Sequence, residues 1–183
     1  MRIAIIGWGS LIWDPRNLNT SSDKWYQDGP MLPIEFARIS NDGRLTLVIL
    51  PDCEKQQTLW ALSALATIED ARENLRLREG RTKNQHIHSR IRGGAAKPDS
   101  ISREVLTQID GWLEAHLDID AVVWTGLPSN WEEKRGCSWS LIEAEAYLNS
   151  LDGDVCKRAR EYIDRAPQEI RTEFRKLIEM SSG

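Results

Sequence analysis

The segment of residues 3–15 constrains this chain most, because it begins as a buried strand and ends in a glycine-containing loop. Residues 3–6 form an unbroken apolar run that Gly7 closes, the pattern of a strand buried on both faces. Gly7 and Gly9 allow the loop that follows to turn sharply. The backbone amides of residues 9–11 then have no obligatory partner, so we expect them to be available to an anionic oxygen.

Two protein families begin with a strand and a glycine turn, and the spacing of the glycines distinguishes them. A dinucleotide-binding fingerprint needs a third glycine at position 12, where this chain has Ile12. Trp13, Asp14 and Pro15 also break the helical period that should follow in that motif. The spacing therefore argues against a dinucleotide site. A tight turn beneath a core strand, without any binding role, remains an alternative.

The sequence of residues 7–15, G-W-G-S-L-I-W-D-P, resembles the signature loop of the gamma-glutamylcyclotransferase fold. That loop usually reads Tyr-Gly-Ser-Leu and continues as Ile-Trp-x-Pro in the ChaC-like branch. The matching positions are Gly7, Gly9, Ser10, Leu11, Ile12, Trp13 and Pro15. Trp8 departs from the family's tyrosine and offers an N–H donor where the family has a hydroxyl. We expect an α+β fold with flanking helices around a small mixed β-barrel, which the resemblance implies, or a strongly curled sheet. The resemblance also implies a substrate-binding role for Trp8, Gly9, Ser10 and Leu11.

Length and charge limit the class of protein. A chain of 183 residues has the size of one domain, and no Gly-, Ser- or Pro-rich linker divides it. We expect a single domain over 1–183, with 139–183 as a helical C-terminal extension. The formal net charge of −4 gives no electrostatic footprint for nucleic acid or an anionic membrane. With neither a signal peptide nor a spanning segment in the pattern, we expect a cytoplasmic protein.

Hydrophobic periodicity predicts the remaining elements. Strands are expected at 34–39, 45–50, 57–64, 85–92 and 121–125, the first two forming a hairpin around Asp42 and Gly43. Helices are expected at 67–79, 102–117, 140–148, 154–165 and 167–180. The last helix carries an apolar stripe, which should be buried inside the chain or in a homodimer. Its members are Ile170, Phe174, Leu177 and Ile178.

Glu79 is the strongest candidate for acid–base chemistry. It follows Ala71 and Leu75 at steps of four, so a carboxylate continues the inward-facing stripe of the expected helix. A carboxyl in such a position is a candidate proton shuttle. The alternative is a solvated surface ion pair with Arg76 or Arg78.

The same residue carries a second point of resemblance. R-E-G at residues 78–80 is similar to the Arg-Glu-Lys/Gly segment that holds the family's catalytic glutamate, and Glu79 is the matching position. In that family the glutamate takes a proton from the substrate's α-amino group, which attacks its own γ-carbonyl and releases 5-oxoproline and an amine. The resemblance implies that no metal or cofactor is needed. It covers about the first half of the chain, since nothing after Lys83 matches a further motif.

A row of cationic side chains follows on one face of the expected strand 85–92: His86, His88, Arg90 and Arg92. Two imidazoles supply half of a zinc site, but no third ligand lies nearby in the sequence. The pattern favours a satisfied or solvated strand face, and the functional alternative is that His86, His88 and Arg90 contact a distal carboxylate of the substrate. Cys137 and Ser10 lack the partners expected of catalytic nucleophiles.

The sequence therefore predicts a gamma-glutamylcyclotransferase-like enzyme that acts on a small gamma-glutamyl amine or peptide. We expect the loop at residues 8–11 and Glu79 to come together in the fold. The competing hypothesis is a non-catalytic small-ligand-binding protein on the same fold, motivated by Trp8 and by the lack of further motifs after Glu79.

Overall fold

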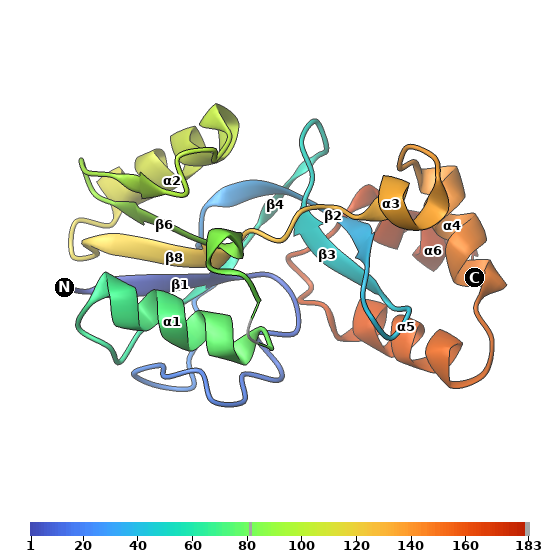
Figure 1. The fold of residues 1–183 in the computed structure, drawn as a ribbon, viewed down its shortest axis with the longest axis horizontal. Helices are drawn as coiled ribbons and strands as arrows, with labels where there is room; N and C mark the ends of the chain where they lie inside the picture. Colours follow the sequence, from blue (N-terminus) through green and yellow to red (C-terminus); the bar gives the residue numbers. More distant parts are fainter. Residues whose placement is uncertain (81, 182–183) are drawn as a thin grey trace. The chain divides into compact units, whose positions relative to one another are not determined.

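The computed structural model describes residues 1–80 and 82–181 and has a mixed α+β architecture with two β-sheets (Figure 1). The predicted α+β class is therefore confirmed. The strands are β1 Ile3–Gly7, β2 Met31–Ile39, β3 Leu45–Ile49, β4 Lys55–Gln57, β5 Leu59–Leu62, β6 Ile87–Ile91, β7 Ala96–Lys97 and β8 Ala121–Thr125. The helices are α1 Ile68–Arg78, the short 3-10 helix η1 Asn84–His86, α2 Arg103–Ala115, α3 Trp131–Arg135, α4 Leu141–Ser150, α5 Gly153–Arg165 and α6 Glu173–Ser181.

The chain divides into two compact units, each built from two separated stretches of sequence. Unit 1 comprises residues 1–32 and 57–127, and unit 2 comprises residues 33–56 together with the chain from Pro128 onward. All sequence-predicted site residues belong to unit 1. That the chain acts as a single domain remains a prediction.

Unit 1 is organised around a five-stranded sheet with the order β5-β1-β8-β6-β7. β1 is parallel to β8 and antiparallel to β5, while β6 is antiparallel to both β8 and β7. β5 and β7 are the two edges, so this sheet is open. Among the described strands neither sheet closes on itself, and the small barrel that the resemblance implies is not confirmed.

The two faces of this sheet are covered by different helices (Figure 1). On one face, Ala71 and Leu75 of α1 pack in one buried cluster with Ile5, Ile87 and Val123 of the sheet. Side chains alternate along a strand, so Arg90 lies on the face opposite to Ile87, where it bonds Asp110 of α2. Both helices start close to the predicted residues 67 and 102, where a hydroxyl caps each one: Thr67 accepts from the Asp70 amide, and Ser102 accepts from the Val105 amide.

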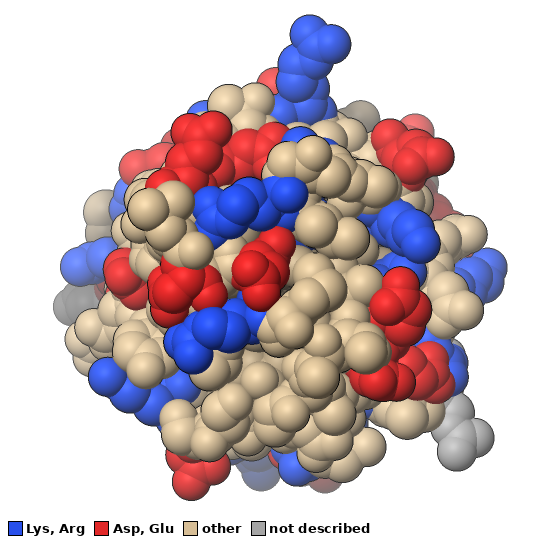
Figure 2. All heavy atoms as spheres, turned by 90° about the vertical axis from the view of Figure 1, so that its left-hand side faces the viewer, with Lys and Arg blue, Asp and Glu red and all other residues tan. Residues whose placement is uncertain are grey.

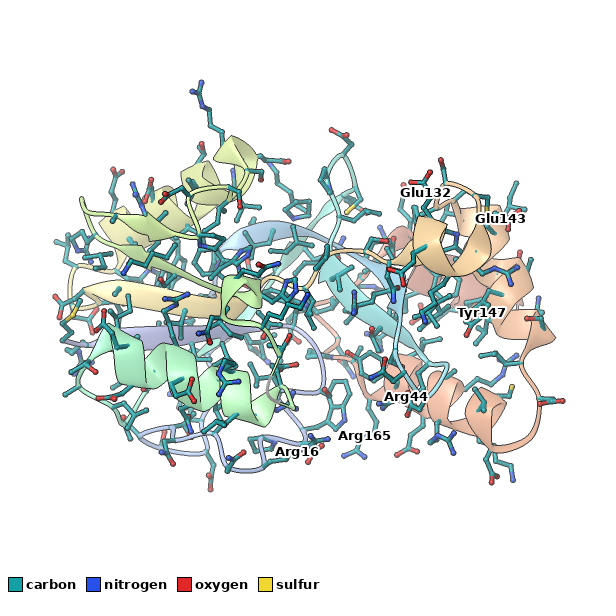
Figure 3. All side chains as sticks on the ribbon, viewed as in Figure 1. Arg16, Arg44, Glu132, Glu143, Tyr147 and Arg165 are labelled. Carbon is teal, nitrogen blue, oxygen red and sulfur yellow. The ribbon has the colours of Figure 1, made fainter. Side chains whose placement is uncertain are left out.

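Unit 2 contains the predicted hairpin and the helices that follow residue 128. β2 and β3 pair antiparallel around the turn at residues 40–44, and Tyr147 of α4 donates its hydroxyl to the Gly43 carbonyl at 2.8 Å (Figure 3). α6 begins at Glu173 rather than at residue 167, because the Thr172 hydroxyl accepts the Arg175 amide and so caps the helix there. Sequence patterns also missed the short helix α3 within the expected loop 126–138.

The predicted apolar stripe of the last helix is covered within the chain. Ile170 and Phe174 are fully buried and pack in unit 2, where the Phe174 ring lies 5.6 Å from that of Phe36. Leu177 and Ile178 are half-buried. No member of the stripe is exposed, as predicted, and a homodimer through this helix remains a prediction.

A carboxylate lies inside unit 2. Glu35 of β2 is 1% exposed, and its two oxygens accept the backbone amides of Phe36 at 2.7 Å and Phe174 at 3.3 Å. Phe174 is in the first turn of α6, whose amides have no partner within the helix. Thr172 also bonds the Glu35 carboxylate through its side chain. A buried side chain of β2 thus holds the start of a helix that lies far along the chain.

The surface of the molecule mixes the two signs of charge on the face shown in Figure 2, where acidic and basic side chains alternate over short distances. This pattern agrees with the small net charge of −4. Within residues 1–80 and 82–181, no helix combines the length and apolar character needed to cross a membrane.

Candidate active site

Glu79 occupies the C-terminal end of α1, where the helix meets Gly80. Its amide donates to the Leu75 carbonyl at 3.0 Å, and Gly80 adopts a φ of 72°, a conformation that suits glycine and ends the helix. The Glu79 side chain is 17% exposed. The buried stripe of Ala71 and Leu75 continues to Arg78 and not, as the spacing predicted, to Glu79, which is the half-buried C-cap residue of the helix.

The neighbouring Arg78 joins Glu79 to the glycine loop. Its side chain is 4% exposed, and its guanidinium donates to Glu79 Oε1 at 2.8 Å, to Ser10 Oγ at 3.3 Å and to the Asp14 carbonyl at 2.6 Å. Ser10 and Glu79 are therefore bonded to the two ends of one guanidinium group. The expected approach of the loop to Glu79 is observed, although almost 70 residues separate the two motifs.

The alternative of a solvated surface ion pair does not describe this arrangement. Arg76 is directed to Glu73, with both carboxylate oxygens of Glu73 at 2.7 Å from its guanidinium nitrogens. Arg78 does pair with Glu79, but the pair is enclosed rather than solvated. A charge pair removed from water has a large desolvation cost, which its other hydrogen bonds must offset.

The loop after β1 folds into a single turn. The Ile12 amide donates to the Gly9 carbonyl at 3.0 Å, and the Asp14 amide donates to the Ser10 carbonyl at 2.9 Å. In the described part of the chain, the amides of Gly9, Ser10 and Leu11 donate to no acceptor. These three N–H groups thus lack a partner within the described residues, and their use by an anionic oxygen remains a prediction.

The residues before the turn are tightly packed. Trp8 is 6% exposed, so its indole lies inside unit 1 rather than on the surface. A Cβ at Gly7 would lie 2.9 Å from the Trp25 ring, closer than side chains pack. Arg16, labelled in Figure 3, follows the turn and pairs with Asp14 at 3.0 Å. The loop therefore has little freedom to move away from Arg78.

The site lies at the carboxyl ends of the parallel strands β1 and β8, and the C-terminal end of α1 lies at the same end of the sheet (Figure 1). Ligands commonly bind outside the carboxyl ends of parallel strands. Two side-chain atoms at these element ends, Arg78 Nε and Thr125 Oγ1, are buried and have no hydrogen-bond partner among the described residues. Unsatisfied polar atoms of this kind are rare inside proteins, so they are candidates for ligand contacts.

The predicted cationic row is divided among different partners. Arg90 holds the Asp110 carboxylate at 2.7 and 2.9 Å and the Gly94 carbonyl at 2.7 Å. Arg92 donates to three backbone carbonyls near the end of α2, those of Leu113, His116 and Ile119. Both guanidinium groups are thus used within unit 1.

The two histidines of the row differ from one another. His86 lies in η1, before the strand, and its carbonyl accepts the Gly126 amide at 2.7 Å. His88 lies in β6 beside Trp124 of β8, with its ring edge-on to the indole at 5.5 Å. The role of His86, His88 and Arg90 as contacts for a substrate carboxylate remains a prediction.

His88 is held in its neutral form by its surroundings. Burial, together with the nearby charges of His86 and Arg72, lowers the pKa of His88 to about 4. Gly126 faces the imidazole so closely that a Cβ there would overlap the ring. At neutral pH this side chain therefore carries no positive charge.

We expect His88 to make the protein acid-labile over a defined range. The unfolded chain takes up a proton on this histidine near the ordinary pKa of 6.5, whereas the folded chain resists it until about pH 4. Stability should therefore be lost as pH falls through this window. Melting temperatures of the wild type and His88→Phe, compared from pH 7 to pH 4, should diverge in favour of the variant. Parallel curves would contradict the assignment.

Sequence reasoning treated Arg78 only as a surface partner for Glu79 and did not consider Thr125. One signal for Arg78 was present. Among the buried residues of α1, Ala71, Leu75 and Arg78 follow each other at steps of four and three, which places the arginine on the inward face. Thr125 has no comparable signal, because its position depends on the register of β8.

The comparisons with known proteins assign no family and no function to these residues. Among the described residues, no group of three or more His, Cys, Asp or Glu side chains is arranged to hold a metal ion. No protein-family model, curated protein or solved structure matches the chain.

Proposed function

We propose that unit 1 is a gamma-glutamylcyclotransferase-like enzyme that cyclises a gamma-glutamyl amine or peptide to 5-oxoproline and releases the amine. One observation carries the proposal: the Arg78 guanidinium bonds both Ser10 and Glu79, the central residues of the two motifs that resemble this family. The small mixed β-barrel of the family fold and a cytoplasmic location are parts of the proposal.

The first step forms the lactam ring. Glu79 accepts a proton from the substrate's α-ammonium group, and the freed amine attacks the γ-carbonyl carbon of the same molecule. Nucleophile and electrophile belong to one substrate, so catalysis consists mainly of holding the bent conformer. The N–H groups at residues 9–11 are suited to stabilise the oxygen that becomes negative in the tetrahedral intermediate.

The second step expels the amine. The intermediate collapses, the bond from the γ-carbon to the leaving nitrogen breaks, and Glu79 gives its proton to that nitrogen. The attacking nitrogen gives up a second proton as it becomes the lactam N–H, and Glu79 passes this proton to the departing amine as well. The products are 5-oxoproline and the amine in its ammonium form, with no net gain or loss of protons and no water consumed. This chemistry needs an acid–base group, an oxyanion site and a shaped cavity, which is why the proposal includes no cofactor.

A substrate screen tests the proposal. Purified protein is incubated with gamma-glutamyl amides and gamma-glutamyl peptides, including glutathione, and 5-oxoproline is measured by mass spectrometry. Matched alpha-glutamyl peptides serve as controls, because they have the same composition but lack the γ-amide. We expect 5-oxoproline from at least one gamma-glutamyl compound and none above background from the controls. Equal background from both sets would refute the proposal.

A second candidate function is ligand binding without turnover. Trp8 favours it, because the buried indole replaces the hydroxyl that the family places at this position. This candidate predicts that 5-oxoproline or a gamma-glutamyl compound binds to the wild type in calorimetry but is not converted. It also predicts that Trp8→Tyr gains turnover without gaining affinity.

A further inference from the structure

We infer that Arg78 is a positioning residue that fixes the Glu79 carboxylate and the loop at residues 8–14 in one arrangement. The catalytic meaning of this inference rests on the proposed function. The physical link itself does not: it is made by three hydrogen bonds from one enclosed guanidinium, to Glu79 Oε1, Ser10 Oγ and the Asp14 carbonyl.

The chemistry of arginine explains why one side chain serves all three acceptors. The guanidinium is planar and always charged, and its N–H donors diverge in a fixed fork. In Arg78 one terminal nitrogen faces Glu79, and the other faces Ser10 and Asp14. A lysine ammonium is a single point of attachment and has no such fork, so it cannot hold the carboxylate and the loop in the same fixed relation.

Arg78 and Arg92 are both arginines with several acceptors, but the kinds of group that they contact differ. The Arg92 guanidinium donates only to backbone carbonyls close to the end of α2, which is how an arginine stabilises a helix terminus. Arg78 instead joins the two groups that the sequence identifies as the reactive carboxylate and the binding loop. Its Nε is buried without a partner among the described residues, so the fold alone does not satisfy this side chain.

Leu11 anchors the loop in the apolar core beside α1, whereas the Arg78 guanidinium supplies its polar connection to the end of that helix. Within residues 8–14 the turn is closed by two backbone hydrogen bonds, at Ile12 and Asp14. The Arg78 contacts to Ser10 and Asp14 connect the turn to α1. Without the guanidinium, we expect the turn to open more often and the Glu79 carboxylate to lose its fixed orientation.

The test compares Arg78→Lys and Arg78→Met with Arg76→Met. Arg76 is a matched control, because it lies on the same helix and pairs with a glutamate, but that partner is Glu73 and not a site residue. Each variant is examined by amide hydrogen exchange of residues 8–14, by melting temperature, and by kcat and KM on the substrate found in the screen. Exchange and melting are measured whether or not a substrate is found.

We expect Arg78→Met to exchange faster over residues 8–14 than the wild type, with β6 and β8 unchanged. Misplacement of a catalytic group by about 1 Å costs about 10²-fold in rate, so kcat should fall by about that factor while KM changes much less. Arg78→Lys should retain the fold and lose part of both effects, and Arg76→Met should resemble the wild type.

Two outcomes overturn the inference: wild-type exchange over residues 8–14 in both Arg78 variants, or faster exchange spread evenly over unit 1. The second result would mean that Arg78 only stabilises the fold. If Arg78→Met does not fold, the exchange rates of residues 8–14 in Arg78→Lys provide the test. Localised loop opening in a protein that converts no gamma-glutamyl compound would support the positioning role and refute the proposed function.

Discussion

Replacing Glu79 with glutamine is expected to abolish most of the turnover while leaving the fold and ligand binding nearly unchanged. Glutamine keeps the size of the side chain and can still meet the Arg78 guanidinium through its carbonyl oxygen, but it cannot accept the ammonium proton. General acid–base catalysis contributes about 10²–10⁴ in rate, or roughly 3–5 kcal/mol of barrier. The loss should appear in kcat, with KM changed little.

The matched control for this substitution is Glu73→Gln. Glu73 lies on the same helix and also pairs with an arginine, but its side chain is about half exposed and lies outside the candidate site. The control should have wild-type kcat. If Glu79→Gln releases 5-oxoproline at the wild-type rate on a verified substrate, Glu79 is not the proton shuttle, and most of the case for catalysis is lost.

Replacing Glu35 with alanine is expected to destabilise unit 2 strongly. The substitution leaves the buried amides of Phe36 and Phe174 without their acceptor. Each unsatisfied buried group costs about 1–3 kcal/mol, so we expect the two amides to reduce the free energy of unfolding by about 2–6 kcal/mol. Urea denaturation measures this loss. A change that is no larger than that of an exposed Glu→Ala variant in unit 2, such as Glu132→Ala, would contradict this role of Glu35.

The Glu35 carboxylate should also give unit 2 a characteristic pH dependence. Burial raises the pKa of this carboxyl above its ordinary value, and nearby Glu173 adds to the rise, while the amides of Phe36 and Phe174 oppose it. Because the folded state holds the proton more tightly, the contribution to stability is largest below the pKa of the unfolded chain and is lost as pH rises through the folded-state pKa. The stability difference between the wild type and Glu35→Gln should therefore shrink as pH rises.

Local sequence signals predicted the elements whose causes are themselves local. The caps at Thr67, Ser102 and Ser140 begin their helices at the predicted positions. The hairpin around Gly43 and the strand β8 also have the predicted bounds to within a few residues. In each case the deciding interactions involve neighbours in the chain, so the sequence contains them directly.

Elements that depend on distant partners were predicted less well. The strand expected at 57–64 is interrupted at Thr58, because β4 belongs to the sheet of β2 whereas β5 pairs with β1. The Thr58 hydroxyl donates to the Pro30 carbonyl at this point. Nothing in the apolar pattern of the segment reveals that it changes partners. The start of α6 likewise depends on Glu35, which lies in another part of the chain.

The same distinction applies to the candidate site. Glu79 and the loop at residues 8–11 were identified from short motifs, and the structure adds Arg78 as their link. The cationic row illustrates the opposite case, because alternation predicted neither that β6 leaves out His86 and Arg92 nor which groups the arginines contact. Arg90 meets Asp110 and Arg92 meets carbonyls near the end of α2, and neither pairing is visible in the sequence around the strand.

The discontinuous composition of unit 2 has a consequence for the order in which the chain becomes available on the ribosome. Every residue of unit 1 has been synthesised once Leu127 is made, whereas the hairpin of β2 and β3 must wait for the segment that begins at Pro128. The rings that pack against Phe36, those of Tyr162 and Phe174, are synthesised later still. At this stage of synthesis, all of unit 1 is available to fold, whereas the apolar hairpin still lacks the residues that cover it. Exposed strands of this kind attract one another, so slow or truncated translation should favour aggregation through residues 33–56 rather than through the site.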